Sequence, residues 1–219
     1  MARRSDRPAL TREAVVAAAV DLADTEGLAA LSMRAVAKRV GVEAMSLYHH
    51  VANKEALLDA MVDAVFADFH TPVVGGPWAE EMRARSRSAR AVLKQHPWAV
   101  GLMDSRTSPG WASLVHHDAV LGCLREAGFS WPLAASAFAA LDAHLYGFLV
   151  QELALPFDGG GEDLEGLATQ MLEALPEGAL PYFTQFTLEH ALAPGYDFGL
   201  EFDVGLELVI EGLTRRLGS

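Results

Sequence analysis

The amino-acid sequence predicts an all-α protein of 219 residues, with a small N-terminal domain of three helices followed by a larger helical domain. Apolar residues recur at intervals of three and four along most of the chain, which is the spacing of one helix face, and no segment alternates as a β-strand does. Ser, Thr and Gly stand where these helical segments would begin and end. We place the two domains at residues 1–56 and 57–219.

The first three predicted helices are short and closely spaced. Thr11 begins the first, which ends at Gly27. Ser32 is placed to cap the second, and Gly41 stands where that helix must stop. After a two-residue turn, a third helix runs roughly over residues 44–51. Two short helices joined by such a turn form a helix-turn-helix, in which the second helix enters the major groove of DNA.

Side-chain size and spacing fit this arrangement. Ala37 is small enough to lie where two helices cross, while Leu47 and Val51 are one turn apart and would face inward. The residues on the outward side of the third helix are then Met45, Ser46, Tyr48 and His50. Spacing alone is equally compatible with an ordinary helical hairpin.

Glycine and proline divide the rest of the chain into longer helical segments. Residues 54–69 read as a helix that links the two domains, ended by the sequence TPVVGGP at 71–77. Residues 96–109 are expected to be irregular. The remaining predicted helices cover residues 78–95, 111–127, 131–155, 164–175, 181–192 and 200–217.

Two of these helices are apolar on more than one side. The segments 131–155 and 200–217 each carry large apolar residues around most of their circumference. A helix that is apolar on both sides must be buried on both sides. It is then either a central helix in the core of a monomer or part of an interface between subunits.

Composition indicates a cytoplasmic protein. Apolar residues make up 51% of the chain but form no uninterrupted run long enough to cross a bilayer, and the N-terminal sequence MARRSDRPALT lacks the apolar core of a signal peptide. Cys123 is the single cysteine, which excludes an internal disulfide and a zinc-finger pattern. We interpret it as a buried thiol, with a redox sensor as the alternative.

The net charge of -12 is unevenly distributed. Residues 1–56 hold 8 Lys and Arg against 7 Asp and Glu, a net charge of +1, whereas residues 57–219 hold 9 against 22, a net charge of -13. The acidic body argues against non-specific coating of nucleic acid. Four arginines precede or begin the first helix, where they form either an arm that reaches DNA or a solvated tail; they are Arg3, Arg4, Arg7 and Arg12.

The amino-acid sequence of the N-terminal segment is more specific evidence for its function than the helical spacing alone. The sequences TREAVVAAAVDLADTEGLAALSMRAVAKRV and VGVEAMSLYHHVANKEALLDAM, which together cover residues 11–61, closely resemble the DNA-binding domain of the TetR family of transcriptional repressors. Looser similarity to the tetracycline-repressor branch continues through Trp78 and from Gly128 to the C-terminus.

This resemblance implies a function and an assembly. An N-terminal three-helix helix-turn-helix DNA-binding domain would be joined to a larger α-helical ligand-binding and dimerisation domain. The protein would be a repressor that binds a palindromic operator as a homodimer, paired through the helices near 131–155 and 200–217, and is released by a small-molecule effector. No cofactor is implied. The alternative is a dimeric DNA-binding regulator without a small-molecule ligand.

The resemblance also places the DNA contacts. Arg34 matches a position at which such repressors use arginine against a base, and its guanidinium suits guanine. Ala44 and Met45 stand where the tetracycline repressor has a polar residue and a proline, so the operator is expected to differ. The positions that match phosphate-contacting or nearby residues are Ser46, Tyr48, His50 and Lys54.

The effector pocket is predicted less sharply. His70 is the strongest candidate, because the tetracycline repressor has a ligand-contacting histidine at this position. The other predicted lining residues are Met82, Arg85, Trp98, Met103, His116, His117, His144, Phe148 and Gln151. Gly101 stands at the position of the histidine that holds the drug-bound magnesium, so no metal site is expected, and the effector should be an apolar or aromatic compound.

An enzyme is the least favoured class. Catalysis would have to use His116, His117 and Asp118, perhaps with His144 and Asp142. Adjacent histidines on a helix point about 100° apart and rarely share a metal ion. The sequence also has no phosphate-binding glycine loop, nucleophile elbow or paired-cysteine motif.

Overall fold

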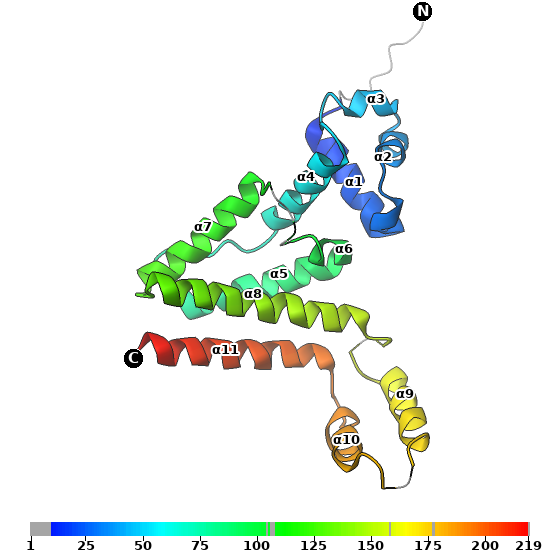
Figure 1. Ribbon diagram of the computed structural model, residues 1–219, viewed down its shortest axis with the longest axis vertical. Helices are drawn as coiled ribbons and strands as arrows, with labels where there is room; N and C mark the ends of the chain where they lie inside the picture. Colours follow the sequence, from blue (N-terminus) through cyan, green and yellow to red (C-terminus); the bar gives the residue numbers. More distant parts are fainter. Residues whose placement is uncertain (1–9, 104, 106–107, 158, 177, 219) are drawn as a thin grey trace, which may run out of the picture. The chain divides into compact units, whose positions relative to one another are not determined.

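A computed structural model describes residues 10–103, 105, 108–157, 159–176 and 178–218. All regular structure in these residues is helical, which confirms the predicted fold class. The chain forms two compact units, residues 1–127 and residues 128–219, and each is described by itself (Figure 1).

Three short helices begin the first unit. They are α1 (Arg12–Glu26), α2 (Met33–Val40) and α3 (Ala44–Leu47). The Thr11 hydroxyl accepts a hydrogen bond from the backbone N–H of Ala14 and so caps α1. These helices pack around an apolar core whose fully or nearly fully buried members include Val15, Ala19, Leu22, Leu31, Val36, Ala37, Leu47 and Val51.

The helix α4 (Lys54–Ala67) joins this small core to the rest of the unit. Its first half belongs to the N-terminal core, through residues such as Leu57 and Met61, whereas its second half packs against α7 (Trp111–Glu126). The helices α5 (Trp78–Gln95) and α6 (Pro97–Val100) lie between them in the sequence. A shift of α4 would therefore move the N-terminal core.

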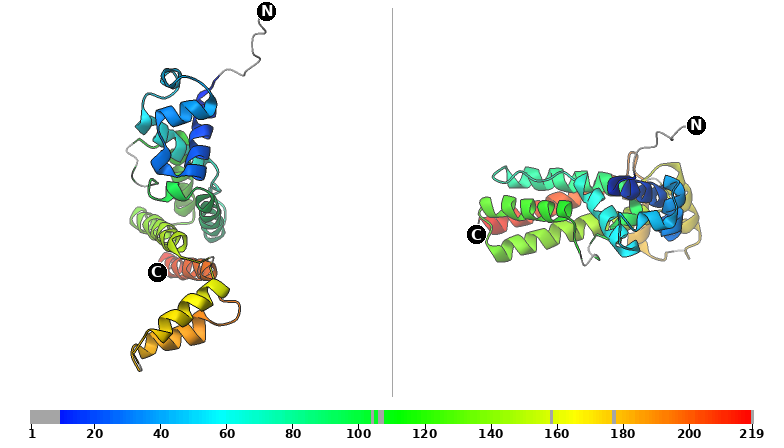
Figure 2. Two further views of the ribbon diagram at one scale, coloured as in Figure 1. Left: turned by 90° about the vertical axis from the view of Figure 1, so that its right-hand side faces the viewer. Right: turned by 90° about the horizontal axis from the view of Figure 1, so that it is seen from above.

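The second unit is built on two long helices. They are α8 (Trp131–Ala154) and α11 (Glu201–Leu217), which run antiparallel and side by side (Figures 1 and 2). Between them in the sequence come α9 (Glu162–Glu173) and α10 (Pro181–Phe186). The residues of α8 and α11 that are buried in this unit are Ala134, Ala137, Leu141, Leu145, Phe148, Leu149, Phe202, Leu206, Ile210 and Leu213.

Helix boundaries agree with the sequence prediction to within two residues except at three places. The third helix ends at Leu47 and continues only as a turn to His50, instead of reaching Val51. The stretch expected to be irregular contains the short helix α6, which starts at a proline. After α10, residues Thr187–Ala191 form a π-helical turn rather than the last turns of an α-helix.

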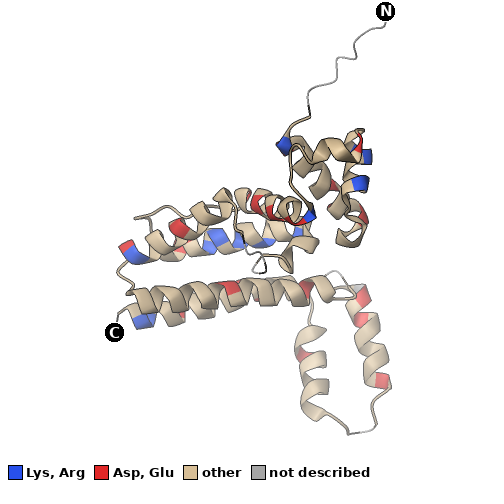
Figure 3. Ribbon diagram, turned by 45° about the horizontal axis from the view of Figure 1, so that its top comes forward, with Lys and Arg blue, Asp and Glu red and all other residues tan. Residues whose placement is uncertain are grey.

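One helix has the length and apolar composition of a membrane span. Among the described residues this is α8, although Asp142 and His144 interrupt its apolar surface. A single helix of this kind is weak support for a membrane location, because core helices of soluble proteins have the same composition. Acidic residues are prominent on α9, which carries no Lys or Arg (Figure 3).

Candidate DNA-binding surface and effector site

The ends of α2 are fixed by local sequence. The Ser32 hydroxyl oxygen accepts a hydrogen bond of 3.2 Å from the backbone N–H of Ala35. At the other end Gly41 adopts a left-handed conformation, with φ of 70°, and its N–H bonds to the carbonyls of Ala37 and Lys38. A residue with a Cβ atom rarely adopts this conformation. Gly41 therefore makes the tight turn that positions α3.

The inward and outward sides of α3 are as the spacing predicts. Leu47 and Val51 are buried in the core of the small domain. Met45 is 73% exposed and Tyr48 is 45% exposed. Of the other predicted DNA contacts, Arg34 and Lys54 are exposed, whereas Ala44, Ser46 and His50 are half-buried. Arg3, Arg4 and Arg7 lie outside the described residues.

A clamp that the sequence analysis missed holds α2 against α1. The guanidinium of Arg39 bonds to the carboxylates of Asp21 and Glu26, the latter at 3.1 Å, and to the Thr25 hydroxyl at 3.1 Å. The hydrogen bond to Asp21 is the main cause that raises the pKa of Arg39. This arginine is therefore occupied within the domain. Only its distance of 13 to 18 residues from these partners hid the contact in the sequence.

A second contact joins α6 to α1. One carboxylate oxygen of Asp24 accepts a hydrogen bond of 2.6 Å from the indole N–H of Trp98. The same oxygen lies 2.8 Å from His96 Nδ1. Trp98 also packs against the N-terminal core, as does Leu102. Trp98 is one of the residues that the sequence predicts to line an effector pocket, and the structure places its polar atom against α1.

Two of the predicted pocket residues form a buried pair. Arg85 on α5 and His116 on α7 are each 1% exposed. Arg85 Nε donates a hydrogen bond of 3.1 Å to His116 Nε2. Burial is the main cause that lowers the pKa of His116 to about 3, and the positive charge of Arg85 lowers it further. His116 is therefore neutral at physiological pH.

Two aromatic rings, one near the end of α4 and one just after it, pack against this histidine. The ring of Phe66 lies 5.8 Å from that of His116, and the ring of Phe69 lies 5.7 Å away. The two phenylalanines are themselves 5.1 Å apart. His117 lies 5.8 Å from Phe66 and bonds through Nδ1 to the carbonyl of Ser113. The helices α4, α5 and α7 thus meet at His116.

His70 lies close to this region but has a polar partner of its own. Its Nε2 atom is 2.8 Å from the Glu81 carboxylate, and its backbone N–H donates to the hydroxyl of Ser88. The hydrogen bond with His70 is the main cause that lowers the pKa of Glu81. Met82, also on α5, is completely buried. Met103 and His117 line a small cavity of about 40 Å³ that also includes Phe66.

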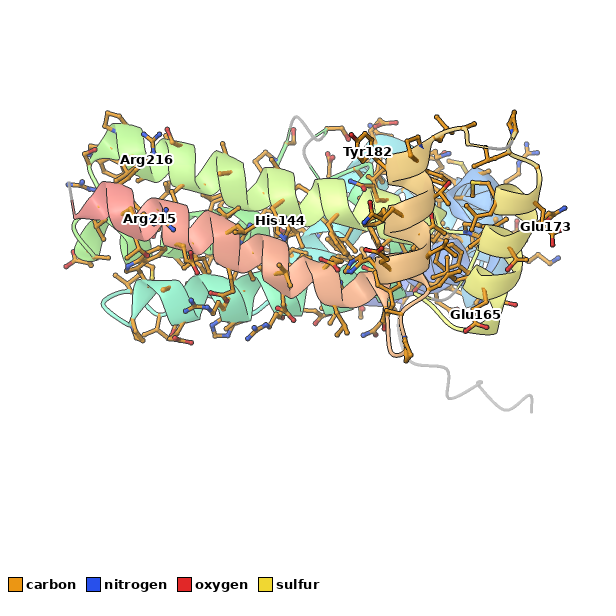
Figure 4. All side chains as sticks on the ribbon, turned by 90° about the horizontal axis from the view of Figure 1, so that it is seen from below. His144, Glu165, Glu173, Tyr182, Arg215 and Arg216 are labelled. Atoms are coloured by element: carbon orange, nitrogen blue, oxygen red, sulfur yellow. The ribbon has the colours of Figure 1, made fainter. Side chains whose placement is uncertain are left out.

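The remaining predicted pocket residues belong to the second unit. His144 Nε2 lies 2.9 Å from the backbone carbonyl of Phe202, so the histidine of α8 bonds to α11 (Figure 4). The ring of Phe148 stacks on that of Phe198, with centroids 4.8 Å apart. Gln151 is exposed. The predicted set is thus divided between two units, and Arg85 and His116 are its directly bonded members.

Potential metal ligands do not gather in the described part of the chain. There, no three His, Cys, Asp or Glu residues lie close enough to hold a metal ion. Gly101 follows α6, and a side chain at this position would meet no atom within 4 Å. Cys123 is buried, and burial is the main cause that raises the pKa of its thiol. The thiol form is therefore favoured, as expected for a structural cysteine.

Both parts of the chain match known protein families. Residues 15–61 match the family described as bacterial regulatory proteins, tetR family, and residues 72–217 match the family described as tetracyclin repressor-like, C-terminal domain. Together these matches span both the small N-terminal domain and most of the larger one.

Relatives of known sequence and structure agree with these matches. A transcriptional regulator of the helix-turn-helix type from Saccharopolyspora erythraea is 32% identical over 97% of this chain and 88% of its own. The transcriptional repressor DrrR1 of Streptomyces coeruleorubidus is 33% identical over 96% of this chain and 79% of its own. The TetR family protein ActR of Streptomyces coelicolor, solved with actinorhodin, is 29% identical, with a TM-score of 0.79 over 96% of this chain and all of that one.

Proposed function

Because the chain belongs to the TetR family of bacterial regulatory proteins, we propose that it represses transcription by binding a palindromic operator as a homodimer and is released by a small apolar or aromatic effector. Members of this family are transcriptional regulators and not enzymes. We assign DNA binding to residues 1–56, and effector binding and dimerisation to residues 57–219. The protein would act in the cytoplasm.

The helix-turn-helix is the single observation that carries the DNA-binding part of the proposal. Gly41 and the clamp at Arg39 fix α2, while Met45 and Tyr48 project from the following helix into solvent. A well-packed domain that exposes a methionine and a tyrosine beside exposed basic residues is suited to a groove of DNA. We propose that Arg34 and Met45 contact the bases. Ser46, Tyr48, His50 and Lys54 would contact the phosphates of the DNA or lie near them, and so position the domain along the duplex. Ala44 would lie close to the DNA.

Exposed apolar residues support the homodimer. The described surface of α8 and α11 includes Trp131, Val150, Val204 and Leu208, all more than half exposed in a single chain. Such residues on long paired helices favour a second copy of the chain as the covering partner. Two copies would also hold two DNA-reading domains at the spacing of two half-sites.

Packing also supports a route from effector to DNA. The first half of α4 is part of the N-terminal core, whereas Phe66, near its end, contacts His116 on α7. A molecule bound beside His116 would displace the end of α4 and with it the DNA-reading domain. We place the effector at the residues of unit 1 predicted from the sequence, among which Arg85 and His116 form the buried pair beside Phe66. These residues are His70, Met82, Arg85, Trp98, Met103, His116 and His117.

Selection of binding sites from random-sequence DNA tests the proposal with the purified full-length protein. We expect palindromic sites that bind two protomers, and release of these sites by at least one aromatic compound. Asymmetric sites bound by one protomer would contradict the homodimer. Selected palindromes that no compound releases would favour the alternative, a dimeric regulator without a ligand.

Tetracycline with Mg²⁺ serves as a matched negative probe. Gly101 offers no metal ligand, so thermal unfolding should be unchanged by this mixture. A rise in Tm of several degrees that requires both tetracycline and Mg²⁺ would contradict our choice of effector.

A further inference from the structure

His116 has a hydrogen-bond donor that lacks an acceptor among the described residues. The guanidinium of Arg85 can only donate, and its Nε donates to His116 Nε2. Nε2 must therefore carry the lone pair, and the proton of the neutral ring lies on Nδ1. The Nδ1 atom is buried and has no hydrogen-bond partner there. An unpaired buried N–H is rare in folded proteins and calls for an acceptor.

The charges around His116 favour an acceptor that is negatively charged. Arg85 is directly bonded to the imidazole, and its guanidinium carries a permanent positive charge. Five of the nine Lys and Arg residues after residue 56 lie on α5, the helix that carries Arg85 (Figure 3). An anionic oxygen gains from this positive potential, whereas an ammonium group is repelled.

The walls of the same site are aromatic. Phe66 and Phe69 each lie within 6 Å of the His116 ring, at centroid distances typical of aromatic pairs. A flat ring system can take part in the same contacts. The site therefore combines the N–H donor of His116, the positive charge of Arg85 and the aromatic rings of Phe66 and Phe69.

We propose that the effector is an aromatic acid whose carboxylate or ionised phenol oxygen accepts the hydrogen bond from His116 Nδ1, beside the guanidinium of Arg85, while its ring packs against Phe66 and Phe69. This inference rests on the proposed function and adds the charge of the effector and the groups that recognise it. Arg85 takes part in further interactions, so the unpaired donor of His116 is the observation that requires an acceptor, and the guanidinium bonded to the same ring favours an acidic one.

Matched probes test the charge of the ligand. Benzoate, naphthalene-2-carboxylate, anthracene-2-carboxylate and anthraquinone-2-carboxylate are each compared with the corresponding carboxamide and aminomethyl compound, using calorimetry on the full-length protein. At least one acid should bind at least tenfold more tightly than its amide and its amine. The proposal fails if amides or amines bind as tightly as the acids, or if no acid binds.

Nuclear magnetic resonance of ¹⁵N-histidine-labelled wild-type protein tests the contact without a mutation. The Nδ1 proton of His116 should shift downfield when the tightest acid is added, because a bond to an anion is shorter and stronger. An unchanged signal in the presence of bound acid would show that a buried water, and not the ligand, satisfies this donor, and would overturn the proposal.

Variants separate the role of the donor from general damage. His116→Met, which removes the N–H group, and Arg85→Gln, which removes the charge, should each weaken acid binding at least tenfold. His190→Gln is the control, because His190 is half-exposed on the π-helical turn of the second unit and should bind the acid as wild type does. Wild-type affinity in folded His116→Met would contradict the proposal.

Operator binding is measured on the same preparations. If a neutral aromatic compound releases the DNA and the acids do not, the regulator is ligand-responsive and this inference alone is wrong. If the protein selects no operator, the proposed function fails whichever compounds bind.

Discussion

At the level of single residues, the polar contacts between helices have distinct roles. Arg39 and Asp24 are satisfied within the DNA-binding domain and its contact with α6, and they hold helices in place. Arg85 and His116 also form a pair, yet one nitrogen of the pair is left without an acceptor. A fully satisfied polar contact stabilises a fold, whereas an unsatisfied one is a candidate for ligand binding.

The low pKa of His116 predicts a specific dependence of stability on pH. Between pH 6.5 and about 3 the unfolded chain binds a proton that the folded protein does not, so stability falls as pH is lowered through this range. The slope is at most about 1.4 kcal/mol per pH unit. Urea unfolding at pH 7 and pH 5, at fixed protein concentration, should show a loss about 2 kcal/mol larger for wild type than for His116→Gln. Equal losses would contradict the lowered pKa.

Gly110 tests how closely α4 and α7 approach each other. The Asp63 carboxylate accepts a hydrogen bond of 2.9 Å from the backbone N–H of Ser113, and a Cβ atom on Gly110 would overlap with that carboxylate. Gly110→Ala should therefore reduce the free energy of unfolding by about 1–3 kcal/mol. Gly101→Ala is the matched control, because its surroundings are open, and should change it by less than about 0.5 kcal/mol. Equal effects in the two variants would rule out the steric explanation.

Arg34 and Lys54 are expected to contribute differently to DNA binding. Arg34→Ala should relax the preference at one base step of each half-site, at a cost of about 1–3 kcal/mol on the preferred sequence. Lys54→Ala should weaken binding to all sequences alike. It should also reduce the slope of log Kd against log salt concentration by about 1, because one phosphate contact is lost. Fluorescence anisotropy on the selected operator and its single-base variants, at several salt concentrations, measures both. Equal loss of discrimination in the two variants would contradict this division.

At the scale of single elements, short helices gain their definition from contacts with other helices. The helix α6 has four residues, too few to be stable alone. Asp24 holds it through Trp98 and His96, and Trp98 packs on the N-terminal core. α6 is therefore an attachment point between the DNA-binding domain and the larger domain.

Hydrogen exchange measured by mass spectrometry tests this attachment. Asp24→Ala removes the acceptor for Trp98 and His96, so backbone amides of residues 98–103 should exchange at least tenfold faster, while those of α2 remain protected. Asp21→Ala is the matched control, because it weakens the clamp at Arg39 and should affect α2 instead. Unchanged exchange of α6 in Asp24→Ala would contradict the attachment.

At the scale of the whole molecule, assembly is expected to depend on α8 and α11. Leu208 is 68% exposed in the single chain, although it lies on a helix whose other side is packed against α8. Leu208→Asp should therefore fold normally, dissociate the dimer at micromolar concentration and weaken operator binding at least tenfold, because each half-site would have to be bound separately. Light scattering and anisotropy measure the two effects.

The control for this variant is Val73→Asp. Val73 is exposed to a similar degree but lies in the loop between α4 and α5, so assembly should be unchanged. A Leu208→Asp protein that remains a dimer would show that the subunits pair through another surface.

Most of the helices, the caps of α1 and α2 and the DNA-reading motif can be predicted from the sequence, because these features depend on neighbours within a few residues. Ser32 and Gly41 mark the ends of α2, and residues 78–95 form α5 as predicted. The spacing of apolar residues also predicted the all-α class, and the resemblance over residues 11–61 predicted the family.

Contacts between distant side chains become visible only in the folded protein. Asp24 and Trp98 are 74 residues apart, and Arg85 and His116 are 31 apart, so no local pattern pairs them. The tertiary structure also decided that Trp98 bonds to the DNA-binding domain while His116 keeps a donor unpaired. The physical reason is that burial and hydrogen bonding between helices follow from how whole helices pack, whereas helix formation and capping follow from local sequence.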